Sequence, residues 1–293
     1  MPSPQGPLLA RRRLGAELRR LRGSRTLDEV AAETLISTSK LSRLENGQGV
    51  PQPRDIRDLL AHYEADRVTA DRLRRWAADG RRQAWWKEYS EVIRDSADVV
   101  FDYESGASVI RTYASMVLPG LLQTEAYATR LLTAIFPQRT PAQIATLVQV
   151  RLRRQDILTG EGDDLTRLFT VIDEAAVRRA LAIGPSEQGR AQLLHLREIS
   201  QRPNISVRIL PLDAGLHAAT QGSFTVYQFS DDIDRDVVHL ESRTGDRFLE
   251  ETSSVLDHLR LFDAVNGRAL DNSQSRDLLT RLVEAPHPSQ EQK

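Results

Sequence analysis

The stretch LDEVAAETLISTSKLSRLENG, residues Leu27–Gly47, contains two short helical patterns separated by residues that do not look helical. Thr26 directly precedes the first pattern, and its hydroxyl can cap a helix over 27–34. Ser37 can cap a second helix, which stops near Asn46. Two helices joined by a three-residue turn predict a helix-turn-helix.

The second of these helices has two different faces. Leu41 and Leu44 are three residues apart and face inward, and Ala31 is small enough for the second helix to cross the first there. Three more apolar residues are expected on the inner face, namely Val30, Leu35 and Ile36. The outward positions are polar and none is acidic: Thr38, Ser39, Lys40, Ser42 and Arg43. Such a face suits the major groove of DNA, whose base edges and phosphates present acceptors.

The composition excludes several kinds of protein and site. At 293 residues the chain exceeds the ~100–200 residues of one domain, so two domains are expected. The chain has no cysteine, which excludes disulfides, thiolate nucleophiles and cysteine-ligated metals. No stretch approaches the ~18 apolar residues of a membrane span, and the N-terminus lacks the apolar core of a signal peptide. We therefore expect a cytoplasmic protein without membrane contact.

Charge is distributed unevenly along the chain. Residues 1–87 contain 18 Lys and Arg against 11 Asp and Glu, a net charge of +7. Residues 88–293 contain 22 against 30, a net charge of −8. This asymmetry predicts a basic N-terminal module that binds a polyanion. Arginine makes up 37 of the 40 basic residues, so a single surface arginine is weak evidence of function.

Apolar spacing and β-branched runs predict an α+β protein. Strands are expected at 168–173, 205–212, 223–229 and 237–241, between helices such as the one from Thr140 to Gly160. The predicted organisation is a disordered N-terminus at 1–10, an all-α five-helix DNA-binding domain at 11–66, a helical bridge at 67–93, an α+β domain with a small, partly antiparallel sheet at 94–283, and a disordered tail at 284–293.

The N-terminal motifs resemble the Cro/C1-type (XRE) helix-turn-helix family, whose DNA-binding domain is lambda-repressor-like. The matching segments are LGAELRRLR, TLDEVA, ISTSKLSRLENG and RDIRDLLAHYEA, and SRLENG is the most specific. The resemblance implies that Glu45 pairs with an arginine of the first helix, for which Arg20 is expected. The family commonly has glycine in the turn where this chain has Leu35. If that position needs a positive φ, leucine is strained there, and the turn would use a different conformation.

The same resemblance assigns roles to the residues around the second helix. Contacts to base edges fall on Thr38, Ser39 and Arg43, with Lys40 able to reach a base or a phosphate. Contacts to phosphate fall on three residues where helix starts and a loop expose N–H groups: Thr26, Ser37 and Asn46. Double-stranded operator DNA is therefore the expected partner, and the protein would be associated with the nucleoid when bound.

The C-terminal two-thirds resembles the effector domain of WhiJ-like actinobacterial regulators. The matching segments, from about Trp85 to Leu279, are LPGLLQTEAYA, RLRRQDIL, VIDEAAVRR, QLLHLREISQRPNISVRILPLDAGLH, GSFTVYQF and VVHLE. The function of this effector domain is largely uncharacterised. The resemblance implies an antitoxin-like gene arrangement, in which a neighbouring gene encodes a small separate protein.

Catalytic and metal sites are not expected. Asp173 and Glu174 open a helix after a strand, where an acidic pair either acts chemically or caps the helix, and capping is favoured. The six histidines show no metal-binding spacing. His217, in an expected loop, is either a site residue or a surface residue. We therefore predict that the chain is not an enzyme and uses no cofactor or metal.

Two adjacent tryptophans, Trp85 and Trp86, cannot both face inward on one helix. Either one packs in the core and the other on the bridging helix, or the pair forms a dimer or partner surface.

Together these features predict a sequence-specific transcriptional regulator whose C-terminal domain supports homodimerisation and receives a signal, either a small-molecule effector or a partner protein. The alternative is an antitoxin-like interaction subunit that chiefly binds a small partner protein.

Overall fold

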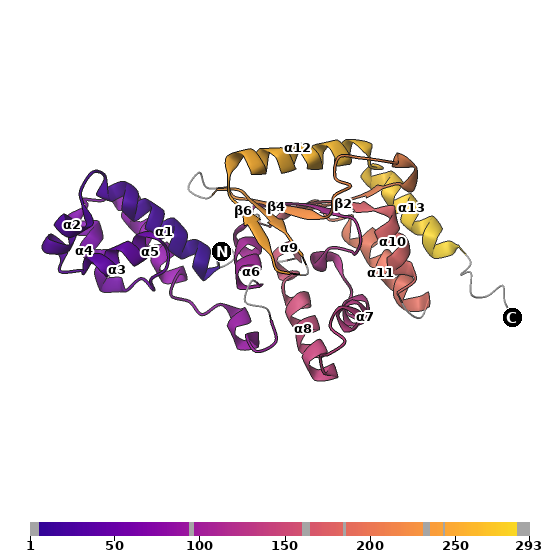
Figure 1. Ribbon diagram of the computed structural model, residues 1–293, viewed down its shortest axis with the longest axis horizontal. Helices are drawn as coiled ribbons and strands as arrows, with labels where there is room; N and C mark the ends of the chain where they lie inside the picture. The colour runs from indigo at the N-terminus through magenta and orange to yellow at the C-terminus, as the bar shows by residue number, and fades with distance from the viewer. Residues whose placement is uncertain are drawn as a thin grey trace. The chain divides into compact units, whose positions relative to one another are not determined.

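The computed structural model describes residues 6–93, 97–159, 165–183, 186–230, 235–242 and 244–285 of the chain. It has two compact units (Figure 1). The N-terminal unit comprises Met1–Glu88, Asp95–Gly106 and Phe229–Asp234, and the C-terminal unit comprises Tyr89–Arg94, Ala107–Gln228 and Arg235–Lys293. Within the described ranges, no helix is long and apolar enough to span a bilayer.

The N-terminal unit is helical, as predicted. Its elements are α1 (Pro7–Arg22), α2 (Leu27–Thr34), α3 (Thr38–Glu45), α4 (Pro53–His62), α5 (Arg67–Asp79), the short 3-10 turn η1 (Trp85–Tyr89), which ends one residue past the unit, and α6 (Ala97–Gly106). Helices α1 to α5 share one apolar core, which includes Leu18, Val30, Leu41, Ile56 and Trp76.

Two boundaries differ from the predicted ones. Helix α1 begins at Pro7, so the disorder expected over 1–10 is wrong for residues 7–10; residues 1–5 lie outside the described part. Proline suits the first helical position because the N–H it lacks would have no helical partner there, and Leu9 is buried. Helix α5, which was expected in a separate bridge, contributes Leu73 and Trp76 to the core of the helical domain.

The tryptophan pair packs on α6. Trp86 is almost fully buried and meets the ring of Phe101 edge-on, with ring centroids 5.7 Å apart. Trp85 stacks on the same Phe101 ring at 6.0 Å. Both rings can share one partner because η1 is a 3-10 turn rather than the α-helix expected from the spacing.

Helix α1 receives its N-terminal cap from α6. Gly6, at the cap position, offers no side chain, and Asp102 accepts hydrogen bonds from the backbone N–H of Leu8, at 3.0 Å, and of Leu9. A side chain 94 residues away thus satisfies N–H groups that an isolated helix leaves unpaired. Burial raises the pKa of Asp102 to about 7, although these two hydrogen bonds act in the opposite direction.

The C-terminal unit contains one mixed sheet of six strands in the order β3-β2-β1-β4-β5-β6. The strands are β1 (Val109–Ala114), β2 (Arg167–Asp173), β3 (Ile205–Leu210), β4 (Phe224–Gln228), β5 (Val237–Leu240) and β6 (Arg247–Leu249). Strands β1, β2 and β3 are parallel, whereas β4 is antiparallel to β1 and leads into β5 and β6. The four predicted strands are present, but β1, which lies inside the sheet, and β6, at its edge, were missed.

Helices cover both faces of this sheet. They are α7 (Glu125–Ile135), α8 (Pro141–Arg153), α9 (Asp156–Thr159), α10 (Glu174–Leu181), α11 (Ser186–Ile199), α12 (Thr252–Arg268) and α13 (Asn272–Glu284), with short turns η2 (Gly120–Leu122) and η3 (Leu212–Ala214). Figure 1 shows α12 along one face and α8 and α9 on the other side. Alternate strand residues, among them Tyr113, Val171 and Val226, share a core with Phe262 and Val265 of α12.

Three sequence predictions in this unit concern the ends of helix α8 and the C-terminal tail. Thr140 caps α8, with Pro141 at the first position, as predicted, but α8 ends at Arg153. Gly160, expected to end that helix, lies outside the described part. The disordered tail predicted over 284–293 also lies outside the described part, except for residues 284 and 285.

The buried carboxyl of Asp102 predicts a pH dependence of stability. Its folded pKa of about 7 lies above the unfolded value of about 3.9, so folding favours the protonated form. The stability that this group contributes is complete below about pH 4 and is lost as the pH rises through about 7. Asp102→Asn keeps an acceptor for α1 but cannot ionise, and it should remove this component, which is at most about 4 kcal/mol.

The measurement is the free energy of urea unfolding of the full chain from about pH 4 to about pH 8. Wild type and Asp102→Asn should diverge in stability toward high pH, with the variant the more stable relative to wild type. Parallel profiles for the two proteins would contradict the assignment.

Candidate nucleic-acid interface

Local caps build the helix-turn-helix. The Thr26 hydroxyl oxygen accepts a hydrogen bond from the N–H of Glu29, whose carboxylate accepts one from the N–H of Thr26, forming a capping box at the start of α2. Ser37 Oγ accepts from the N–H of Lys40 at the start of α3. Both caps were predicted. Because each hydroxyl acts as an acceptor, Thr26 and Ser37 keep their own protons for donation to a phosphate.

The turn between α2 and α3 depends on Leu35. This residue has φ 58° and ψ 22°, the left-handed conformation that glycine adopts without strain. Leu35 therefore takes up the strained geometry itself, at a cost of about 1–2 kcal/mol. Its side chain is 90% exposed, so the prediction that it belongs to the inner face is wrong. The left-handed turn directs the side chain outward, and only Ile36 of the pair is buried.

Two of the four predicted base-contacting residues face solvent without partners. Ser39 and Arg43 are exposed, and neither makes a hydrogen bond or ion pair with a described residue. Thr38 differs, because its hydroxyl donates to Asp28 of α2 at 2.8 Å. A guanidinium free of intramolecular contacts, on the outward face of α3, can bind the two acceptors of a guanine edge.

Lys40 is held by α4. Its Nζ lies 2.6 Å from Oδ2 of Asp55, whose side chain is largely buried. That oxygen has no well-aligned hydrogen bond within the described residues, so the contact acts mainly as a charge pair. Part of the positive charge expected to reach DNA is therefore compensated within the protein. Asp55 was not singled out from the sequence, where it is only one acid among several.

The end of α3 presents Asn46. Its backbone N–H donates to the carbonyl of Ser42 at 3.0 Å, and its side-chain amide lies 3.4 Å from the Ser42 hydroxyl. Gly47 follows with φ 69°, which ends the helix and leaves Asn46 exposed, as its predicted phosphate contact requires.

The structural ion pair joins α1 to α3, but through a different arginine. Glu45 accepts two hydrogen bonds from Arg22, at 2.6 and 2.9 Å, and Arg19 lies 3.6 Å away. Arg20, the predicted partner, instead binds Glu17 on its own helix at 2.7 and 2.8 Å. Residues two positions apart in an α-helix are rotated by about 200° around its axis, so Arg20 and Arg22 face opposite sides. The pairing with Glu45 raises the pKa of Arg22 above its ordinary value.

A glycine lets α1 and α3 approach each other. A Cβ atom on Gly15 would lie 2.5 Å from the carbonyl oxygen of Leu44 and 2.6 Å from that of Glu45. Any larger residue would push α3 away from α1. The signal in the sequence was a glycine inside a helical pattern, which usually marks a close approach.

Comparison with known proteins defines the family. A family model described as a domain of unknown function (DUF5753) matches residues 98–281, more than half of the chain. The chain belongs to this family. A second model, described as a helix-turn-helix domain, matches residues 13–73 of this DUF5753 protein. No curated protein and no solved structure matches the chain.

The match over 13–73 covers α2, the turn and α3, and it extends into α5. The DUF5753 chain therefore carries a helix-turn-helix domain at its N-terminus, which is the arrangement of a DNA-binding regulator. This agrees with packing, since Leu73 of α5 lies in the same core as α3.

Asp173, the first residue of the acidic pair in the C-terminal unit, caps α10. Asp173 Oδ1 accepts from the N–H of Ala175 at 2.8 Å, and Glu174 accepts from the N–H of Leu212 and binds Arg178. The predicted capping is present. In the described part of the chain, no group of three His, Asp or Glu is arranged to hold a metal ion.

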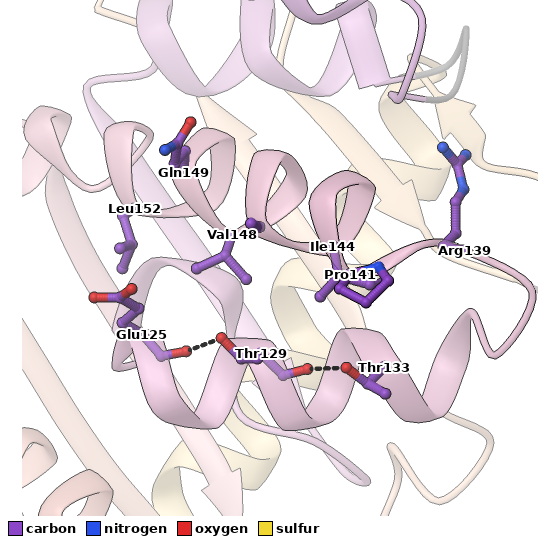
Figure 2. Close-up of a pocket in the computed structure, with 10 residues that line it drawn as sticks. Glu125, Thr129, Thr133, Arg139, Pro141, Ile144, Val148, Gln149 and Leu152 are labelled. Carbon is purple, nitrogen blue, oxygen red and sulfur yellow. Dashed lines mark hydrogen bonds between the residues drawn. The ribbon is translucent and has the colours of Figure 1, made fainter.

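A groove of about 420 Å³ lies between α7 and α8 (Figure 2). Its floor contains Ile144 and Val148, which are buried. The hydroxyls of Thr129 and Thr133 donate to carbonyls one turn earlier on α7, so the polar groups left for a partner are those of Glu125, Arg139 and Gln149. An apolar floor with charged residues beside it suits the surface of an amphipathic helix.

The ion pair of Arg22 predicts unequal effects for two neighbouring arginines. Arg22→Ala would leave Glu45, only 4% exposed, without its bidentate partner, and should lower the free energy of unfolding by about 2 kcal/mol. Arg20→Ala removes a side chain that is 64% exposed and leaves Glu17 paired with Arg72 at 3.0 Å, so it should cost less than about 1 kcal/mol. Thermal and urea unfolding of both variants provide the measurement. Equal losses, or a larger loss for Arg20→Ala, would contradict this pairing.

Proposed function

We propose that this protein is a sequence-specific transcriptional regulator that inserts α3 into the major groove of an operator. The observation that carries the proposal is the exposed guanidinium of Arg43, which has no partner among the described residues, on the second helix of a helix-turn-helix. The excess of basic residues in the first 87 positions supports binding to a polyanion. We propose that the chain acts by binding, without catalysis, in the cytoplasm and on the nucleoid.

Each polar residue of α3 has a distinct role in this proposal. Arg43 reads a guanine through two parallel hydrogen bonds, and Ser39 donates to an adjacent base edge. Thr38, bound to Asp28, keeps a hydroxyl oxygen as acceptor for a base amino group. Thr26, Ser37 and Asn46 bind phosphates and fix the position of α3. Lys40 exchanges Asp55 for a phosphate when DNA binds.

We further propose that the protein binds DNA as a homodimer, because one recognition helix reads only a few base pairs. The groove between α7 and α8 supports a symmetric contact. Glu125 and Arg139 are at opposite ends of this groove in Figure 2. A two-fold axis across the groove would place each glutamate opposite the arginine of the second copy.

On the resemblance to WhiJ-like actinobacterial regulators, we propose that the C-terminal unit receives a signal. The second candidate is an antitoxin-like subunit whose C-terminal unit binds a small partner protein. The same groove favours this candidate if no second copy occupies it, since an amphipathic helix of a partner would fit an apolar cleft between helices.

Operator binding tests the role of Arg43. Arg43→Ala should weaken operator binding about tenfold or more and relax the preference at one base position. Lys40→Ala should weaken binding to all sequences and reduce the salt slope by less than about one unit, because Asp55 already compensates part of its charge. Operator and random-DNA affinities are measured against salt concentration, with thermal melts as controls. Wild-type affinity for both DNAs in Arg43→Ala would show that α3 is not the recognition helix.

The dimer is tested with two alanines of α8. Ala145 lines the groove and is exposed, whereas Ala142 is exposed on the same helix but does not line it. Ala145→Arg should convert a dimer to a monomer in light scattering at micromolar concentration, and Ala142→Arg should not. A wild-type monomer that still binds a single operator tightly would rule out the dimer proposal.

A further inference from the structure

The three parallel strands of the C-terminal unit end at one edge of the sheet. Register pairs Ala114 of β1 with Ile172 of β2, and Asp173 of β2 with Leu210 of β3, so the segments that follow these strands start side by side. Ligands of open α/β sheets usually bind at the carboxyl ends of parallel strands.

Three side chains, here called the carboxyl-edge cluster, meet there: Tyr113, Asp173 and His217. The Tyr113 hydroxyl lies 3.4 Å from Asp173 Oδ2 and 3.3 Å from His217 Nε2. The carboxylate and the imidazole are 4.0 Å apart. Tyr113 is the penultimate residue of strand β1, whereas His217 comes from the long loop between β3 and β4.

The carboxyl-edge cluster has more hydrogen-bond acceptors than protons to donate. The Tyr113 hydroxyl has one proton, which it donates to Asp173. In the neutral imidazole, His217 Nε2 then carries the ring proton to contact the same hydroxyl oxygen, and Nδ1 is an acceptor. Nδ1 is buried and has no hydrogen-bond partner among the described residues, and the side chain is only 9% exposed. A buried acceptor in this state favours a ligand that supplies a donor.

Asp173 adds an accessible negative charge. Its side chain is 20% exposed, and no lysine or arginine nitrogen of the described chain lies within 4.0 Å of it. Nearby arginines are engaged elsewhere, since Arg178 binds Glu174 and Arg179 donates to the carbonyl of Met116. A cation from solvent can therefore pair with Asp173 without displacing a protein partner.

Exposed apolar residues occur in the segments that follow β1 and β3 at this edge. Met116 is 59% exposed and Val117 40% exposed in the segment after β1, and Leu212 is 56% and Leu216 88% exposed in the loop after β3. Leu216 directly precedes His217, and the N–H of Leu212 donates to Glu174, the neighbour of Asp173. These four residues, called the apolar rim, provide a surface that water solvates poorly beside the acceptors.

We propose that this edge is a binding site for a small amphipathic amine. Its ammonium group donates to Asp173 and to the imidazole of His217, and its apolar body packs on the apolar rim. The two acceptors favour an ammonium group over a carboxylate, and the rim favours an amine with an apolar body over a wholly polar one. The proposed binding of the amine depends on this geometry alone. A role of the amine as a signal for DNA binding rests on the proposed function.

Three probes with one apolar body test the headgroup preference: 2-phenylethylamine, 2-phenylethanol and phenylacetate. Calorimetry or ligand-observed NMR on the full-length protein should give an affinity for the amine at least about tenfold above that of the alcohol and the acid. In Asp173→Asn, which keeps an oxygen to cap α10, this preference should fall about tenfold. Asp213→Asn removes the same charge from an exposed residue of the loop that contains His217, and it should leave the amine preference unchanged.

Several results of these binding measurements would overturn the proposed amine site. Absence of binding at millimolar probe concentration, equal affinity for the three probes, or an amine preference that persists in Asp173→Asn would overturn the site. Nitrogen NMR of the His217 ring gives an independent readout, because the site requires the proton on Nε2. A proton on Nδ1 would remove the second acceptor and overturn the proposed contact.

A final measurement separates this site from the proposed function. If the amine binds and changes operator affinity in wild type but not in Asp173→Asn, the edge is the signal site. If it binds without any effect on operator affinity, the site holds and its regulatory role is rejected. Loss of operator binding in Arg43→Ala tests the DNA interface independently of both results.

Discussion

A buried carboxyl side chain near each end of α1 anchors this helix in the N-terminal unit. At the start, Asp102 accepts the N–H groups of Leu8 and Leu9; near the end, Glu45 accepts both arms of Arg22. The first contact joins α1 to α6, and the second joins α1 to α3. Because Gly15 allows α3 to lie directly on α1, α3 has little freedom to tilt. Its orientation therefore depends on α1 rather than on the turn that precedes it.

This arrangement separates the polar residues of the recognition helix into two groups. Thr38 is bound to Asp28 and Lys40 to Asp55 within the unit, so both side chains lose less conformational entropy on binding DNA. Asp55 also compensates part of the positive charge of Lys40. Arg43 has no such partner and keeps its full capacity for hydrogen bonds. In the proposed complex, specificity depends on the free guanidinium, and affinity depends on how easily phosphates replace the internal acids.

The C-terminal unit combines two kinds of strand arrangement, and each creates a different surface. Its parallel half ends in loops that bring Tyr113, Asp173 and His217 together beside exposed apolar side chains. The connection between β1 and β2 contributes the α7–α8 hairpin with its groove. Strand β1 contributes Tyr113 to the first of these surfaces and leads into the hairpin that forms the second.

The sequence by itself determined the α+β class, the helix-turn-helix and its caps at Thr26 and Ser37, because such caps involve residues only three apart. It also indicated which face of α3 is polar, since helical periodicity is local. It did not identify Arg22 as the partner of Glu45, Asp55 as the partner of Lys40, or Asp102 as the cap of α1. Those choices depend on how helices rotate and pack against each other, which distant residues decide. The carboxyl-edge cluster likewise exists only because parallel pairing brings β1, β2 and β3 to one edge.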